Sequence, residues 1–213
     1  MENTPAVRSV FRRVMTASML LAVLAFGSSV AGAATLKLPT GISKTAAYRM
    51  YSEQVDSQRN ITRLVDGEMS SFDILGRTVT STAATFRIKV RLANGASALG
   101  VMTFKKYNNK WYFDSIKRAT VVSATGRQVT DPDVGVLNTM LEQQTANQDV
   151  LGKLVNGTYT RVTLGAPDPG FNSTVVPVTF SGSKANQKGE ITAIKRAVKG
   201  KQYWFLVSFA AVK

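Results

Sequence analysis

The chain has 213 residues with 27 Lys and Arg against 13 Asp and Glu, a formal net charge of +14, and it contains no cysteine and no histidine. Without these two residue types, disulfides, Cys/His zinc sites and Ser-His-Asp or Cys-His catalysis are excluded. The sequence also lacks clustered carboxylates and a glycine-rich phosphate loop. We therefore expect a protein that is not an enzyme, with no metal and no cofactor.

Residues 1–33 are typical of a secretory signal peptide. A basic segment precedes the apolar run Met19–Phe26, and Ala31-Gly32-Ala33 forms a cleavage site before Ala34. The run is shorter than the roughly 20 residues that span a bilayer. We predict a chain that is secreted, or associated with the cell envelope, after cleavage near Ala33, with no transmembrane segment in the mature part. An N-terminal membrane anchor is the alternative.

The chain resembles itself at a spacing of about 90 residues. Several motifs of different composition recur at nearly the same shift, which indicates an internal duplication. We predict a first module over residues 34–122, a linker over 123–130 and a second module over 131–213. The matching pairs are Glu53-Gln54 with Glu142-Gln143, Leu64-Val65-Asp66-Gly67 with Leu154-Val155-Asn156-Gly157, and Trp111-Tyr112-Phe113 with Tyr203-Trp204-Phe205.

The first module begins with a helical pattern. Ile42, Ala46, Met50 and Val55 recur at helical spacing on one apolar face, and a short second helix follows and ends before Gly67. Alternating apolar residues then predict strands joined by turns at Asn94-Gly95 and Asn108-Asn109. The predicted strands cover 68–75, 85–92, 98–106 and 111–116.

The second module repeats this order. Asp131 is the expected helix cap, with Pro132 at the first helical position. The predicted strands cover 158–164, 174–181, 188–198 and 202–212, and Pro177 indicates that its strand is an edge strand or bulged. The predicted fold class is α+β, with two tandem modules, each a helix plus a short second helix packed on a curved antiparallel sheet of about four strands.

The closing strand of the first module, Lys110-Trp111-Tyr112-Phe113-Asp114-Ser115-Ile116, resembles that of secreted bacterial members of the cystatin-like fold, within the nuclear-transport-factor-2-like superfamily. The resemblance implies a cone formed by helix and sheet. It also implies a non-catalytic or uncharacterised secreted protein. The enzymes of the superfamily usually place an Asp/His pair in the cone, and this chain has no histidine.

Asp114 is the one carboxylate set inside this aromatic strand. We interpret it as an exposed acid on the outer face of the sheet, paired with a nearby lysine. The alternative is a base inside the cone whose pKa is raised by burial.

Cations alternate with apolar residues on the strand over 85–92. Arg87, Lys89 and Arg91 lie opposite the apolar set, and Lys105 and Lys106 lie on the neighbouring strand. Together they predict a site that attracts an anionic polymer or an acidic protein surface, with no specific nucleic acid. A solvated face is the simpler interpretation. Other candidate functions are a secreted protein-interaction or inhibitor module, and a small-molecule carrier or lyase using the cone.

Overall fold

The computed structural model describes residues 34–119 and 129–212. The predicted signal peptide and most of the predicted linker lie outside these residues. Thr35–Lys213 form one compact unit. Its helices are α1 (Lys44–Asp56), α2 (Gln58–Val65), α3 (Val134–Ala146) and α4 (Gln148–Val155). Its strands are β1 (Met69–Val79), β2 (Ala83–Leu92), β3 (Ser97–Tyr107), β4 (Lys110–Arg118), β5 (Arg161–Leu164), β6 (Asp168–Pro169), β7 (Ser173–Ser181), β8 (Asn186–Val198) and β9 (Lys201–Ala211).

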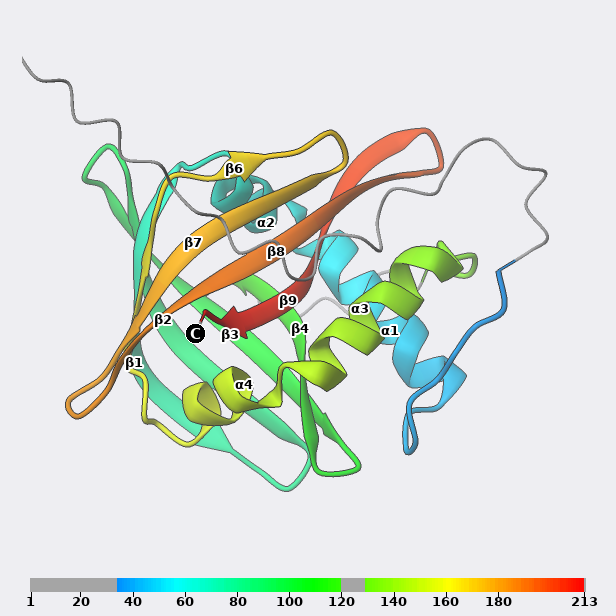
Figure 1. Cartoon of the computed structure of the whole chain (residues 1–213), viewed down its shortest axis with the longest axis horizontal. Helices are drawn as coiled ribbons and strands as arrows, with labels where there is room; N and C mark the ends of the chain where they lie inside the picture. Colours follow the sequence, from blue (N-terminus) through cyan, green and yellow to red (C-terminus); the bar gives the residue numbers. More distant parts are fainter. Residues whose placement is uncertain (1–33, 120–128, 213) are drawn as a thin grey trace, which may run out of the picture. The chain divides into compact units, whose positions relative to one another are not determined.

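The strands form one antiparallel sheet in the order β4-β3-β2-β1-β5-β7-β8-β9, and β6 pairs with β7 (Figure 1). The predicted α+β class and antiparallel pairing are therefore confirmed. The expectation of one separate sheet for each half of the chain is wrong. Pairing of β1 with β5, in which Asp73 lies opposite Arg161, joins the strands of the two halves into one sheet.

The turn predicted at Asn108-Asn109 is confirmed, and a second tight hairpin turn joins β8 to β9. Asn108 and Asn109 have φ angles of 45° and 61° between β3 and β4, and Lys199 and Gly200 have 50° and 77° between β8 and β9. Two consecutive residues with positive φ give the turn that suits the twist of a tight hairpin. Asparagine tolerates this conformation, so the local sequence explains the first turn; in the second turn Gly200 accommodates it readily, whereas Lys199 rarely adopts it.

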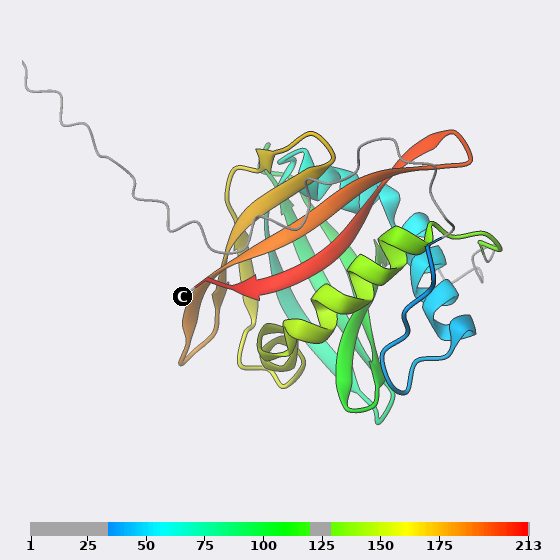
Figure 2. The same cartoon turned by 45° about the vertical axis from the view of Figure 1, so that its right-hand side comes forward.

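The core has two parts, one on each side of the edge strands. The first part fills the space inside the curved sheet and includes Ile61 of α2, Leu151 of α4 and Phe104 of β3. The second part lies under α1 and α3, which Figure 2 shows beside the edge strands. It includes Tyr51, Tyr112 and Phe205. The shorter helices thus pack against the inner face of the sheet, and the longer helices pack outside its edge strands.

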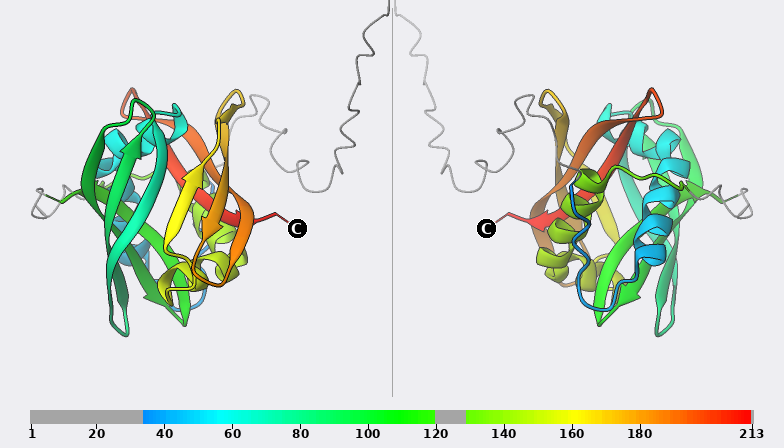
Figure 3. Two further views of the ribbon diagram at one scale, coloured as in Figure 1. Left: turned by 90° about the vertical axis from the view of Figure 1, so that its left-hand side faces the viewer. Right: turned by 90° about the vertical axis from the view of Figure 1, so that its right-hand side faces the viewer.

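Four glutamines attach the helices to the edge strands β4 and β9, which lie beside α1 and α3 (Figure 3). Each side-chain amide bonds a strand backbone as a neighbouring strand would, which covers an otherwise open edge. Gln54 accepts from the Leu206 N–H at 2.8 Å, and Gln144 accepts from the Phe113 N–H at 2.7 Å. Gln58 and Gln148 bond both the N–H and the C=O of Trp204 and Trp111, respectively.

These contacts cross between the halves. Gln54 and Gln58 come from the first half and bind β9, whereas Gln144 and Gln148 come from the second half and bind β4. Gln144 also donates to the Leu206 carbonyl of β9, in its own half. Gln144 bonds β4 as Gln54 bonds β9, whereas Gln143, which the sequence comparison aligned with Gln54, is exposed. Each half therefore closes the edge of the other, and neither half has a complete set of partners within itself.

Three local predictions need correction. The cap of α3 is Asp133, whose Oδ1 accepts from the Val136 N–H at 2.9 Å, so the helix begins after Pro132 and not at it. Strand β5 begins at Arg161, later than expected. Pro177 lies in β7, which has partners on both sides. Proline has no N–H to donate to a neighbouring strand. Pro177 lies opposite the gap between β5 and β6, where its carbonyl accepts a bond from the Gly165 N–H, and no donor from Pro177 is needed there.

No helix within residues 34–119 and 129–212 is long and apolar enough to cross a membrane.

Candidate functional site

The three predicted cations of β2 lie on the outer face of the sheet. Phe86, Ile88 and Val90 are buried inside the curve, so the alternating Arg87 and its two neighbours in the pattern face away from the core. Each of them pairs with a residue of β3: Arg87 with Val101, Lys89 with Leu99, and Arg91 with Ser97.

The two predicted cations of β3 point to opposite faces. Lys105 pairs with Ala83 and shares the outer face with the β2 cations. Lys106 follows it directly and therefore projects to the other face, where its Nζ lies 5.4 Å from the centre of the Trp111 ring. Four of the five predicted residues thus lie on the outer face, whereas Lys106 lies on the opposite face because adjacent strand residues alternate.

The joined sheet brings in two cations that the sequence interpretation missed. Arg161 lies across β1 from Lys89, with Asp73 between them, and its side chain is exposed. Lys188 of β8 is also exposed. It pairs with Thr179 of β7, which in turn pairs with Thr163 of β5 on the outer face. Both residues alternate with buried ones in the sequence, but assigning them to this face required knowledge of the β1–β5 pairing. We call the resulting set the cationic face: Arg87, Lys89, Arg91, Lys105, Arg161 and Lys188.

Few carboxylates balance the cationic face. Asp73 lies between Arg91 and Arg161, with oxygen-to-Nε distances of 3.3 and 3.2 Å. Within the described parts of the chain, the other four cations of the face form no salt bridge. Glu190 also faces outward, opposite Pro177. One acid shared by two arginines leaves an excess of positive charge.

Small hydroxyl side chains separate the cations. Thr85 pairs with Thr103, and Thr163 pairs with Thr179. Ser71 lies between Arg91 and Thr163 but is buried, so the threonines are the hydroxyl groups open to a ligand. Short side chains do not screen the longer guanidinium and ammonium groups from an approaching ligand. The face can therefore offer several cations and hydroxyl donors to one extended anion.

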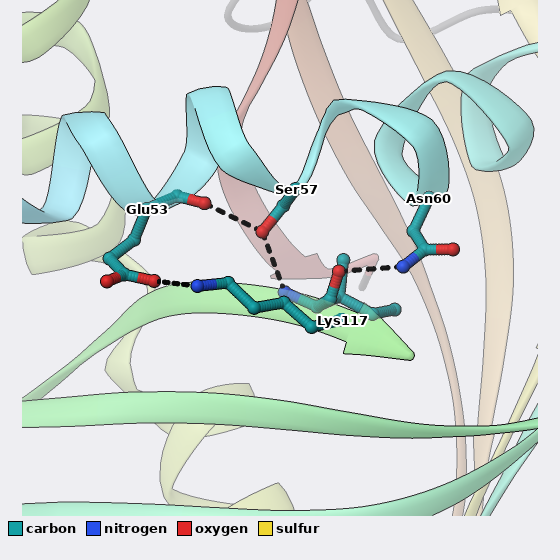
Figure 4. Close-up of polar contacts among 5 residues, drawn as sticks. Glu53, Ser57, Asn60 and Lys117 are labelled. Atoms are coloured by element: carbon teal, nitrogen blue, oxygen red, sulfur yellow. Dashed lines mark hydrogen bonds and ion pairs between the residues drawn. The ribbon is translucent and has the colours of Figure 1, made fainter. Parts of the chain in front are cut away.

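A second polar cluster joins α1 and α2 to the end of β4 (Figure 4). Ser57 donates to the Glu53 carbonyl at 2.7 Å and accepts from the Ile116 N–H at 3.1 Å. Asn60 donates to the Ile116 carbonyl at 2.8 Å, and Lys117 bonds the Glu53 carboxylate at 2.5 Å. All these groups are satisfied by one another, so the cluster fixes the helices on the strand and does not resemble a ligand site.

Asp114 lies beside this cluster at a bulge in β4, where the register shifts between Thr103 and Phe104. It is only 3% exposed, and its Oδ1 has no hydrogen-bond partner. Burial, with the nearby charge of Glu53, raises its pKa to about 6, although Lys105, Arg49 and Lys117 act in the opposite direction. The prediction of an exposed, lysine-paired acid is therefore wrong. The matching position on β9 holds Val207, which is also buried.

The space inside the curved sheet does not resemble a substrate cone. Core side chains such as Phe86, Phe104 and Phe180 occupy it, and the charged groups around Asp114 belong to α1 and to the other side of β3 and β4. A hollow lined by Asn60, among others, has about 20 Å³ of space, enough for one water molecule. Within the described residues, no group of three acidic side chains comes together as metal ligands would.

Comparisons with known proteins give no family for this chain. No protein-family model matches it, and a search of curated proteins found no match. The function must therefore be inferred from the cationic face itself.

Proposed function

We propose that the protein is an exported, non-catalytic binding protein that docks an anionic polymer of the cell envelope on its cationic face. The observation that supports this most strongly is the cluster itself, in which six cations from four strands share one surface with two carboxylates. A linear polyanion releases counterions when several cations neutralise it, so binding increases with the number of aligned cations.

The spacing of the cations suits a polymer that crosses the strands. Neighbouring strands lie about 4.8 Å apart, so Lys89 and Arg161, two strands apart, are separated by about 10 Å at the backbone. Lys188 lies a further two strands beyond β5. An extended polymer of repeating phosphates or carboxylates can contact these positions in succession, whereas a single small anion would contact one or two.

Titration with long-chain polyphosphate tests the proposal. The triple variant R87Q/K89Q/K105Q removes three cations of the face that form no salt bridge. The matched control K44Q/R59Q/K184Q removes the same charge from exposed positions elsewhere. We expect the face variant to bind at least about tenfold more weakly than the unchanged protein. The slope of its plot of log Kd against log salt concentration should be smaller by about two to three. The control variant should change little in either quantity. Equal loss in both variants would show that net charge, and not the face, determines binding.

Export is part of the same proposal. The predicted cleavage near Ala33 would place a mature chain of net charge +12 among anionic envelope polymers, because residues 1–33 carry three arginines and one glutamate. N-terminal sequencing of protein recovered outside the cytoplasm should give Ala34 as the first residue. A chain that keeps Met1 would contradict the export step and leave the binding proposal to be judged by the titration.

We also propose that the two halves are related modules. Support comes from matched contacts. Gln58 and Gln148 clamp Trp204 and Trp111 in the same way, and a lysine lies over each tryptophan ring, at 5.3 Å for Lys195. The resemblance to the nuclear-transport-factor-2-like superfamily stays a prediction.

A further inference from the structure

The loop between β6 and β7 exposes an aromatic side chain. Phe171 is 97% exposed at the tip of this loop, which closes through a bond from the Gly170 N–H to the Ser173 carbonyl at 2.7 Å. The Asn172 carbonyl accepts from the Lys195 N–H of β8 at 2.8 Å, which ties the loop to the neighbouring strand. The aromatic ring is therefore presented on an anchored loop.

Cations without acidic neighbours in sequence lie beside this loop. Strand β8 continues past Lys195 to a turn that holds Lys199 and leads into β9, and the sequence after residue 191 contains no Asp or Glu. The β6–β7 loop and the β8–β9 turn lie at the same end of the compact unit (Figures 1 and 2). The cations of this end are Lys195, Arg196, Lys199 and Lys201.

An aromatic ring next to several cations has a specific chemical complement. A phenylalanine ring is stabilised when it leaves water for an apolar phase. Basic residues near an anionic bilayer are attracted to its surface. A hydrated polymer offers the cations a partner but gives the ring no apolar phase to enter. A bilayer with anionic headgroups satisfies both groups at once.

We propose that the β6–β7 loop and the β8–β9 turn dock the protein on an anionic lipid bilayer, with Phe171 inserted at the headgroup boundary. This inference is independent of the cationic face, because none of its residues belongs to that face. Lys195 and Arg196 lie toward the β8–β9 turn, at the opposite end of β8 from Lys188. A protein with both sites would hold an envelope polymer close to the membrane surface.

Vesicle flotation tests the inference with the chain that begins at Ala34, since Thr35–Lys213 form one compact unit. Vesicles of 30% phosphatidylglycerol in phosphatidylcholine serve as the anionic probe, and pure phosphatidylcholine serves as the neutral one. We expect binding to the anionic vesicles only. F171S should weaken it about tenfold or more, and K199Q/K201Q about tenfold, while L75S, at another exposed apolar residue, should have no effect.

The outcomes separate the two sites. The face variant R87Q/K89Q/K105Q should still float with anionic vesicles, and F171S should still bind polyphosphate. If F171S floats as well as the unchanged protein, or if only the face variant loses flotation, the loop is not the lipid site. Failure of the unchanged protein to float with anionic vesicles also overturns the inference and leaves the polymer proposal intact.

Discussion

Asp114 is predicted to make the protein less stable at neutral pH than a neutral side chain would. The carboxyl is buried with one oxygen unpartnered, and its pKa is raised from an ordinary 3.8 to about 6. That difference corresponds to about 3 kcal/mol of unfolding free energy when the group is ionised, a sizeable fraction of a typical domain's stability.

The sign of the pH dependence follows from proton binding. The folded state holds the Asp114 proton more tightly than the unfolded state does, so this group lowers stability as the pH rises from about 4 to about 6. Its contribution is constant above that window and is absent below it. Burial also raises the pKa of Asp56, which acts in the same direction, so the effect of Asp114 has to be isolated by comparing variants.

Urea unfolding of D114N between pH 4 and pH 8 provides the assay. We expect the unfolding free energy of D114N to exceed that of the unchanged protein by about 3 kcal/mol at pH 7.5. The two free energies should be equal near pH 4. D114V copies the buried Val207 of β9 and should show the same trend. The control D149N alters an exposed acid paired with Lys153 and should change stability by less than about 0.5 kcal/mol. A difference between D114N and the unchanged protein that stays constant with pH would refute the reasoning.

Two further predictions concern the contacts between the halves. Q144A removes the acceptor of the buried Phe113 N–H and should cost about 1–3 kcal/mol in urea unfolding, whereas Q143A, at the exposed neighbour, should cost less than about 0.5 kcal/mol; equal effects would contradict the clamp. A fragment of residues 34–119 lacks the β9 partners of Gln54 and Gln58 and should show no cooperative unfolding by circular dichroism unless residues 129–213 are added; independent folding would contradict the shared core.

The sequence was most informative where structure is determined locally. The Asn108-Asn109 turn followed from residue types that tolerate positive φ, and the outer position of Arg87 followed from its alternation with buried Phe86 and Ile88. Helices and most strands follow the same kind of short-range pattern, which is why their order could be predicted before their arrangement.

Long-range pairing could not be predicted in this way. No local signal shows that β1 pairs with β5, and without that pairing Arg161 would be assigned to a separate sheet. Gln54 and Gln144 look like ordinary polar helix residues, yet both are buried. Gln54 bonds the edge strand of the other half, and Gln144 bonds the edge strands of both halves. Asp114 was misjudged for the same reason, since its burial depends on α1 packing over a bulge.

Mapping backbone amide shifts by NMR during polyphosphate addition tests the central claim most directly. Binding on the cationic face should shift the amides around Arg87, Lys89 and Arg161 most, with smaller changes at Lys44 and Arg59 on the helices. The largest shifts should fall on one continuous surface that spans β2, β1 and β5. Shifts concentrated on the helices, or spread evenly over all the lysines, would contradict a dedicated polymer site.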